Sequence, residues 1–339
     1  MSTLNDQPVN DAQTLNESTS ALPLPLGRGE AVVAFDVGGT DMKSALFSSD
    51  GEMLGLTRTP TPLAGADTPN TVLEAAAQIT ARYAEQFPQV TPRAAGIVVP
   101  GLVDDDKGIG ILASNLGWRD APFKALGEAR LAMPVAFSHD VRGAGEAEFR
   151  LGAARGVRDA AVLVVGTGIA GAFFIDGKPH VAGGYAGEIG HSIVIPDGPD
   201  CACGGKGHME TLASAGAIVR RYVEQSGEPI DGARAVLQRA ESGDTLAQSV
   251  WNDAVHALAL GIAQVITLIA PEVVVVGGGL AQAGPALFDP LERELDSLLT
   301  FHRRPRLLAA QIGEDAGLIG AALGARSLLA RTDAAAALS

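Results

Sequence analysis

The sequence predicts an α/β fold in which one strand-rich unit occurs twice. Each unit contains a buried strand, a glycine turn, a second strand and a hairpin turn, and the two copies cover residues 31–56 and 160–181. After each copy, helices and strands alternate, which is typical of a largely parallel sheet with helices on both faces. We therefore expect two similar lobes with facing glycine turns, and ligands at the carboxyl ends of the strands.

The bulk composition indicates a soluble globular protein with two domains. Its 339 residues exceed the roughly 250–300 at which a single hydrophobic core stops growing. Hydrophobic residues make up 47% of the chain and charged residues 19%, and the formal net charge is -14. This acidic balance argues against binding to nucleic acid or to an anionic membrane, because both need clustered lysines and arginines.

The N-terminal region and the apolar segments favour a cytoplasmic protein. The N-terminal region has no basic segment followed by an apolar stretch, so we expect no signal peptide. The apolar run around residues 257–270 is too short and too interrupted to span a membrane. Residues 1–30 are rich in Ser, Thr, Asn, Gln and Asp, so we expect them to form a disordered tail.

Between and after the two repeated units, helices alternate with strands. Residues 133–138 are expected to form a strand with Asp140 at its carboxyl end, and residues 143–150 then open a helix. Pro271 ends a long apolar helix in the second half. The other expected elements are helices at 71–87, 249–269, 287–299 and 318–330, and strands at 93–99, 272–276 and 306–311.

The two cysteines of the chain stand one residue apart in a cluster of potential metal ligands. Cys201 and Cys203 are accompanied by His191 and His208, a set of four that suits tetrahedral Zn²⁺ in a structural site. The alternatives are a disulfide, which would be strained at this spacing, and two free buried thiols. Glu188 and Glu210 flank the cluster, so a bound metal would also fix two carboxylates.

Three glycine turns favour phosphate binding. The first lies between two strands and opens no helix, which excludes the Walker and Rossmann motifs. Its glycines allow backbone N–H groups to approach phosphate oxygens, and its aspartate is placed to hold Mg²⁺ through water. A plain hairpin turn is the alternative for each turn alone, but three such turns in a duplicated fold favour a nucleotide site. The residues are Asp36, Gly38, Gly39, Thr40 and Lys43, then Gly166, Thr167 and Gly168, then Gly277, Gly278 and Gly279.

These motifs, together with Asn115 and Trp118, resemble the ROK family (repressors, open reading frames and kinases) of sugar kinases in the actin-like ATPase superfamily. The resemblance covers about residues 32–329. It implies a duplicated actin-like (ribonuclease H-like) two-lobe α/β fold with an inserted structural zinc knot. Residues 31–136 would form the first lobe, completed by the C-terminal helix 318–333, and residues 137–317 the second, with the zinc motif at 188–210.

The resemblance also implies an activity. The family transfers the γ-phosphate of Mg-ATP to a hexose hydroxyl, here most simply the 6-hydroxyl of glucose, with Asp140 as general base. Sugar contacts would come from Gly101, Asn115, Asp140, Glu188, His191 and Glu210. Asn115 could instead cap a turn, Glu188 could be solvated, and Trp118 is expected in the core.

Four positions depart from the family pattern. His139 and Arg142 replace two asparagines beside Asp140, and we expect them to favour the ionised form of its carboxyl group. His208 stands where the family has a third zinc cysteine, and Ala170 where the second turn has glycine. Imidazole is an equally good zinc ligand, so the metal site is retained.

Other functions remain open at this point. A repressor would need a basic DNA-binding domain before the first glycine turn, where only about 30 residues stand, with Arg28 as the one basic side chain. A sugar-binding regulator without catalysis, a kinase for N-acetylmannosamine, N-acetylglucosamine, fructose or allose, and polyphosphate as donor are further alternatives. The resemblance implies a homodimer or homotetramer.

Overall fold

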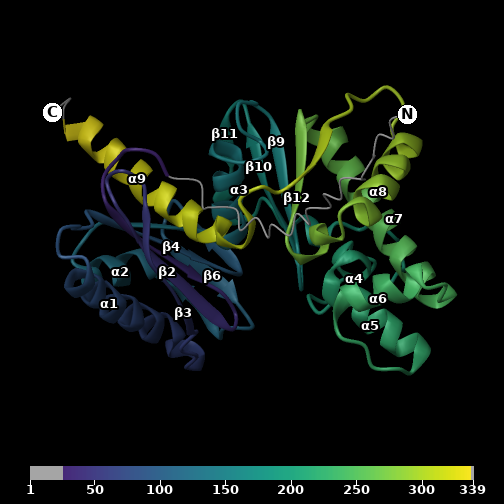
Figure 1. Ribbon diagram of the computed structural model, residues 1–339, viewed down its shortest axis with the longest axis horizontal. Helices are drawn as coiled ribbons and strands as arrows, with labels where there is room; N and C mark the ends of the chain where they lie inside the picture. Colours follow the sequence, from purple (N-terminus) through teal and green to yellow (C-terminus); the bar gives the residue numbers. More distant parts are fainter. Residues whose placement is uncertain (1–25, 337–339) are drawn as a thin grey trace, which may run out of the picture.

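The computed structural model describes residues 26–336 and contains two five-stranded mixed sheets, one in each lobe (Figure 1). The strand orders are β3-β2-β1-β4-β8 and β11-β10-β9-β12-β13, and in each sheet two antiparallel pairings are followed by two parallel ones. This equivalence confirms the predicted duplication. The strands are β1 Val32–Val37, β2 Asp41–Phe47, β3 Met53–Pro60, β4 Ala94–Val99, β8 Val135–His139, β9 Ala160–Val165, β10 Ile169–Ile175, β11 Lys178–His180, β12 Val273–Gly277 and β13 Arg306–Ala309.

The central strands β1 and β4 of the first sheet are buried on both faces because they are apolar without alternation. In β1, Val33 and Phe35 pack on one face among side chains of α1 (Thr68–Gln86) and α2 (Phe123–Leu131). Val32 and Ala34 point to the other face, which α9 (Ala316–Ala336) covers. The last helix of the chain therefore packs on the first lobe, as Figure 1 shows.

The second sheet has the same arrangement. One face packs against α4 to α8, and the other against α3 (Asp140–Arg150), which also crosses α9. A Cβ atom at Gly320 of α9 would lie 1.9 Å from the carbonyl oxygen of Gly143, so this helix crossing requires glycine. The covering helices are α4 Glu210–Ala213, α5 Ala215–Ser226, α6 Gly232–Glu241, α7 Thr245–Ile269 and α8 Pro285–Leu298.

Several elements were not expected. A third sheet, β5 (Leu102–Asp104), β6 (Ile109–Ala113) and β7 (Trp118–Ala121), follows β4 in the first lobe. Its strands have three to five residues, too few for a clear period of two. Helices α2, α5 and α6 also lay outside the expected elements.

Four expectations need correction. Strand β8 belongs to the first sheet and runs to His139, beyond the boundary expected at residue 136. Residues 1–25 of the expected tail lie outside the described part of the chain, but Leu26 is buried in the core under α9. Helices α1, α7, α8 and α9 begin two to four residues before their expected starts. Helix α7, with 25 residues, is long and apolar enough to cross a membrane by length and composition, but it packs in the second-lobe core.

Candidate active site

A cavity of about 220 Å³ lies where the two sheets approach each other. The first lobe contributes Asp36 from β1 and Asp140 from the start of α3. The second lobe contributes Gly277 and Gly278, which follow strand β12, and the first turn of α9 completes the lining. This central cavity thus contains residues of two predicted turns and the predicted base.

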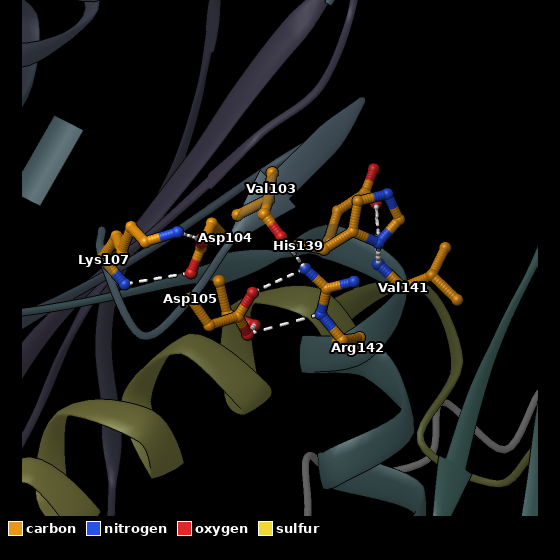
Figure 2. Close-up of polar contacts among 9 residues, drawn as sticks. Val103, Asp104, Asp105, Lys107, His139, Val141 and Arg142 are labelled. Carbon is orange, nitrogen blue, oxygen red and sulfur yellow. Dashed lines mark hydrogen bonds and ion pairs between the residues drawn. The ribbon is translucent and has the colours of Figure 1, made fainter. Parts of the chain in front are cut away.

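Asp140 occupies the corner where β8 ends and α3 begins. One of its carboxylate oxygens accepts the backbone N–H of Val141 at 2.6 Å, and Nδ1 of His139 accepts the same N–H at 3.2 Å (Figure 2). His139 is therefore the N-cap of α3. Burial raises the pKa of Asp140 to about 6, and the Val141 N–H and the Arg142 charge offset only part of this shift.

The expectation that His139 and Arg142 favour the ionised form of Asp140 is confirmed in direction for Arg142, whose charge lowers the pKa of Asp140, but burial raises this pKa by more. Burial, assisted by the charge of Arg142, lowers the pKa of His139 to about 4, so the imidazole is neutral at neutral pH. Arg142 directs its guanidinium to Asp105. Desolvation of Asp140 therefore exceeds the effect of the Arg142 charge on its pKa.

Asp36 faces Asp140 from the first strand. Its pKa is raised to about 7, first by burial and then by the negative charge of Asp140, while Lys43 acts in the opposite direction. A Cβ atom at Gly317 in α9 would lie 2.6 Å from Oδ2 of Asp36, so only glycine leaves room for the carboxylate there. A divalent cation held through water by Asp36 would offset the repulsion between these two carboxyl groups.

Lys43 of the first glycine turn has partners that no motif indicated. Its ammonium group lies 3.1 Å from Oδ1 of Asp315 and donates to the backbone oxygen of Glu314 at 2.5 Å. The segment containing these residues is fixed from the other side by Glu148, a buried glutamate of α3. One carboxylate oxygen of Glu148 accepts the N–H groups of Gln311 and Ile312 at 2.8 and 2.7 Å. Residues 311–315 thus connect α3 with the first glycine turn.

The second and third turns also have specific neighbours. Oε2 of Glu210 accepts the N–H of Ile169 at 2.8 Å, and a Cβ atom at Gly168 would lie 2.6 Å from the same oxygen. This contact ties a predicted sugar ligand to the second turn. Gly278 has a φ of +82°, and a Cβ atom there would meet the Val165 carbonyl oxygen at 2.4 Å.

A second cavity, of about 470 Å³, begins where the third turn ends. Gly279 lines it, while Gly277 and Gly278 line the central cavity, so this turn separates the two spaces. Trp251 and Arg234 contribute an aromatic and a cationic side chain to the second cavity.

The predicted sugar ligands come from both lobes. Glu188 lies close enough to His139 for its charge to raise the pKa of that imidazole, although burial dominates. The second-lobe segment therefore faces the β8–α3 corner of the first lobe. The side-chain amide of Asn115 lies beside Gly39, since a Cβ atom there would be 3.5 Å from Nδ2. Gly101, with a φ of +95°, packs against the Leu112 carbonyl oxygen and shapes the turn after β4.

The four predicted zinc ligands converge. One ligand atom from each lies within 4.8 Å of all the others. Nδ1 of His191 is 3.4 Å from Nδ1 of His208 and 3.8 Å from Sγ of Cys201, and Cys203 Sγ is 3.4 Å from Nδ1 of His208. Zn–N and Zn–S bonds of about 2.0–2.3 Å imply edges of roughly 3.3–3.8 Å in a tetrahedron. The geometry therefore fits Zn²⁺, and Nε2 of His191 remains free to face Glu188, whose Oε2 is 3.9 Å away.

Comparison with known proteins identifies the family to which the sequence is similar. The sequence model of the ROK family matches residues 32–327. The glucokinase of Halalkalibacterium halodurans is 31% identical over 311 residues, which are 85% of this chain and 92% of the relative. The N-acetylmannosamine kinase of Escherichia fergusonii is 32% identical over 296 residues, 86% of this chain and 97% of the relative.

A solved structure extends the likeness to three dimensions. The crystal structure of a ROK family glucokinase from Streptomyces griseus in complex with glucose and AMPPNP superposes with a TM-score of 0.74 at 29% identity. The superposition covers 88% of this chain and 99% of the glucokinase chain. The mixed-sheet α/β fold is therefore shared by both lobes with a sugar kinase of the actin-like ATPase class.

Proposed function

The chain belongs to the ROK family, and from this premise we propose that it is an ATP-dependent hexose kinase with Asp140 as general base. The observation that carries the proposal is the central cavity, which places Asp140 opposite Asp36 and the third glycine turn. A base of this kind needs a pKa near the working pH. A pKa of about 6 leaves Asp140 mostly ionised at pH 7 and able to accept a proton.

In the proposed reaction, Asp140 accepts the proton of the sugar hydroxyl while that oxygen attacks the γ-phosphorus of ATP. The bond from that phosphorus to the bridging oxygen breaks, and ADP leaves. Phosphoryl transfer needs mainly positioning and charge stabilisation from the protein. The backbone N–H groups of the glycine turns would supply the donors, with the Thr40 hydroxyl beside the first turn.

The two cavities suggest how ATP would lie. We assign the nucleoside to the second-lobe cavity, where Trp251 and Arg234 offer an apolar face and a cation. The phosphates would then pass the third turn into the central cavity. Asp36 is the residue that would hold Mg²⁺ through water. When bound, Mg²⁺ neutralises charge on the phosphates of ATP.

For the sugar we propose contacts with Gly101, Asn115, Glu188, His191 and Glu210. Glu188 and Nε2 of His191 are the best supported, because they face the corner that carries Asp140. Carboxylates and imidazoles suit a ligand rich in hydroxyls, since a buried hydroxyl needs a partner. Glucose is the first candidate, and N-acetylmannosamine the second, because the relatives include kinases named for both sugars.

Zinc is proposed as a structural ion held by His191, Cys201, Cys203 and His208. The cluster lies between Glu188 and Glu210 in the chain, so the metal would position both proposed sugar ligands. Elemental analysis of the purified protein tests this directly, without reference to activity.

We further propose a soluble, cytoplasmic homodimer. Ile193, Leu268 and Phe301 are exposed to 58%, 82% and 88%. Gln264, one helical turn before Leu268, donates to the Ile193 carbonyl oxygen, and Thr267 contacts His302, so the three apolar side chains belong to one neighbourhood. An apolar patch of this kind marks a protein contact, and a second copy of the chain is the partner we propose.

The central test is ADP release measured with ATP and a panel of sugars that includes glucose, N-acetylmannosamine, N-acetylglucosamine, fructose and allose. Turnover of one or more sugars supports the kinase. Calorimetric sugar binding without turnover, with ATP or with polyphosphate as donor, would instead favour a sugar-binding regulator.

A further inference from the structure

Arg142, one of the two departures beside Asp140, has a specific partner in the third sheet. Its side chain is 7% exposed. Nη2 lies 2.5 Å from Oδ1 of Asp105, and Nε lies 3.3 Å from Oδ2 of the same carboxylate (Figure 2). Two parallel N–H···O bonds between a guanidinium and a carboxylate fix both groups in direction as well as distance. Asp105 belongs to the turn between β5 and β6, 37 positions earlier in the chain.

The same carboxylate also holds the chain on the other side of Asp140. Oδ2 of Asp105 accepts the hydroxyl of Ser138 at 2.5 Å. Ser138 stands two residues before Asp140 and Arg142 two residues after it. One side chain therefore fixes both arms of the corner at which β8 becomes α3, and Asp140 is at the apex of that corner.

The turn that carries Asp105 is itself fixed. Asp104 accepts the backbone N–H of Lys107 at 3.0 Å and its ammonium group at 2.8 Å (Figure 2). The β5–β6 turn is therefore a firm support for the Asp105 carboxylate.

A segment of the second lobe contacts the backbone beside Asp105. Nη2 of Arg142 donates to the Val103 carbonyl oxygen at 2.7 Å. A Cβ atom at Gly184 would lie 2.0 Å from that oxygen, so only glycine allows this approach. Gly184 precedes Glu188 in the second-lobe segment proposed to bind the sugar.

We propose that Asp105 and Arg142 are positioning residues, which hold Asp140 in place for proton transfer and connect it with the sugar-binding segment of the second lobe. This inference rests on the proposed kinase function. Arg142 also carries a charge that lowers the pKa of Asp140, and Asp105 is the counter-ion of that charge. The family asparagine at position 142 would lack this cation.

The first test compares the variants Asp105→Ala, Asp105→Asn and Arg142→Asn with a matched control, Asp106→Ala. Asp106 is the next residue of the turn and is exposed, so its removal deletes the same charge without the contacts. A small displacement of a catalytic group costs up to about 10²-fold. We expect kcat to fall roughly 10–100-fold in Asp105→Ala, with a smaller change in the sugar KM, and to stay near the parental value in the control. A parental kcat in folded Asp105→Ala overturns the proposal.

The pH dependence of kcat distinguishes a positioning role of the pair from a general loss of structure around Asp140. The titratable and charged groups around Asp140 are Asp36 from β1, His139 from β8, whose Nδ1 lies 3.2 Å from Oδ1 of Asp140, and Arg142 from its own helix. Asp105→Asn leaves the cation of Arg142 uncompensated, which should move the acid limb of kcat to lower pH. Arg142→Asn leaves the carboxylate of Asp105 and should move it to higher pH. Shifts in the same direction, or none, contradict the proposal.

The double variant Asp105→Asn with Arg142→Asn provides the cross-check. It removes both charges, so the acid limb should return towards the parental position while kcat remains low. A double variant with parental kcat would show that the pair does not position the base.

Hydrogen exchange of residues 138–142 tests the contact independently of turnover. These amides should exchange faster in Asp105→Ala than in Asp106→Ala, because the first variant frees both arms of the corner. If the parent phosphorylates no sugar but this difference is present, the kinase function fails and the structural part of the inference stands. Equal exchange in the two variants overturns the inference, whatever the parental activity.

Discussion

Replacing Asp140 by asparagine should make the protein more stable and nearly inactive. Folding raises the pKa of this carboxyl group from 3.8 to about 6. A raised pKa means that the group favours the fold fully below its unfolded value, and that this contribution is lost as the pH rises through about 6. At pH 8 the ionised Asp140 therefore destabilises the protein. The pKa of Asp140 rises by about two, and each step of one in pKa corresponds to roughly 1.4 kcal/mol, so the destabilisation at pH 8 has an upper limit near 3 kcal/mol.

The side chain is 30% exposed, and solvent screening reduces that limit to roughly 1–2 kcal/mol. Asp140→Asn should accordingly raise the Tm at pH 8 by roughly 1–3 °C, and the difference should vanish as the pH approaches 4. The amide cannot accept the hydroxyl proton, so kcat should fall by about 10²–10⁴. The dissociation constant of the sugar should change less than about tenfold, which is about 1.4 kcal/mol.

The assay combines steady-state kinetics, calorimetric sugar binding and thermal unfolding at pH 8 and pH 4. His139→Asn is the control, because asparagine is also a good N-cap and leaves the base in place. It should retain appreciable activity. For the parent, kcat/KM should be half-maximal near pH 6 and about a tenth of maximal near pH 5. A near-parental rate of Asp140→Asn would refute the base, and a lower Tm at pH 8 would refute the argument from burial.

Three further predictions follow from the other sites. Purified protein should contain about one zinc per chain, and Cys201→Ser should lose metal and stability and raise the sugar KM; metal-free parental protein with full activity would contradict the assignment. Leu268→Glu with Phe301→Glu should convert a dimer into a monomer in light scattering without unfolding, whereas a monomeric parent at micromolar concentration would refute the dimer. Gly317→Ala should displace the carboxylate of Asp36, which lies 2.6 Å from the added Cβ, and raise the KM for Mg-ATP more than that for the sugar; equal KM values in parent and variant would argue against a role of Asp36 in nucleotide binding.

The order of the elements and the chemistry of the clusters were open to prediction from the sequence because both depend on local patterns. Apolar runs separated by glycine turns predicted the two repeated units, and each forms three strands of a five-stranded sheet. The ligand types and short spacing of Cys201, Cys203 and His208 predicted a convergent cluster, which the tertiary structure contains. Within so short a segment, few backbone paths keep the ligands apart.

Contacts between distant segments were decided only by the tertiary structure. Lys43 contacts Glu314 and Asp315, which are 271 and 272 positions later in the chain, and Arg142 contacts Asp105, 37 positions earlier. No hydrophobic periodicity of the sequence predicts such pairs. The sequence suggested that His139 and Arg142 would favour an ionised Asp140, because neighbours in the chain were the only visible charges. Packing of the two sheets around that corner removes water from the carboxyl group, and the cost of this desolvation exceeds the effect of the Arg142 charge. The sequence thus identified the groups that we propose carry the chemistry, and the approach of the two lobes determined their protonation and their partners.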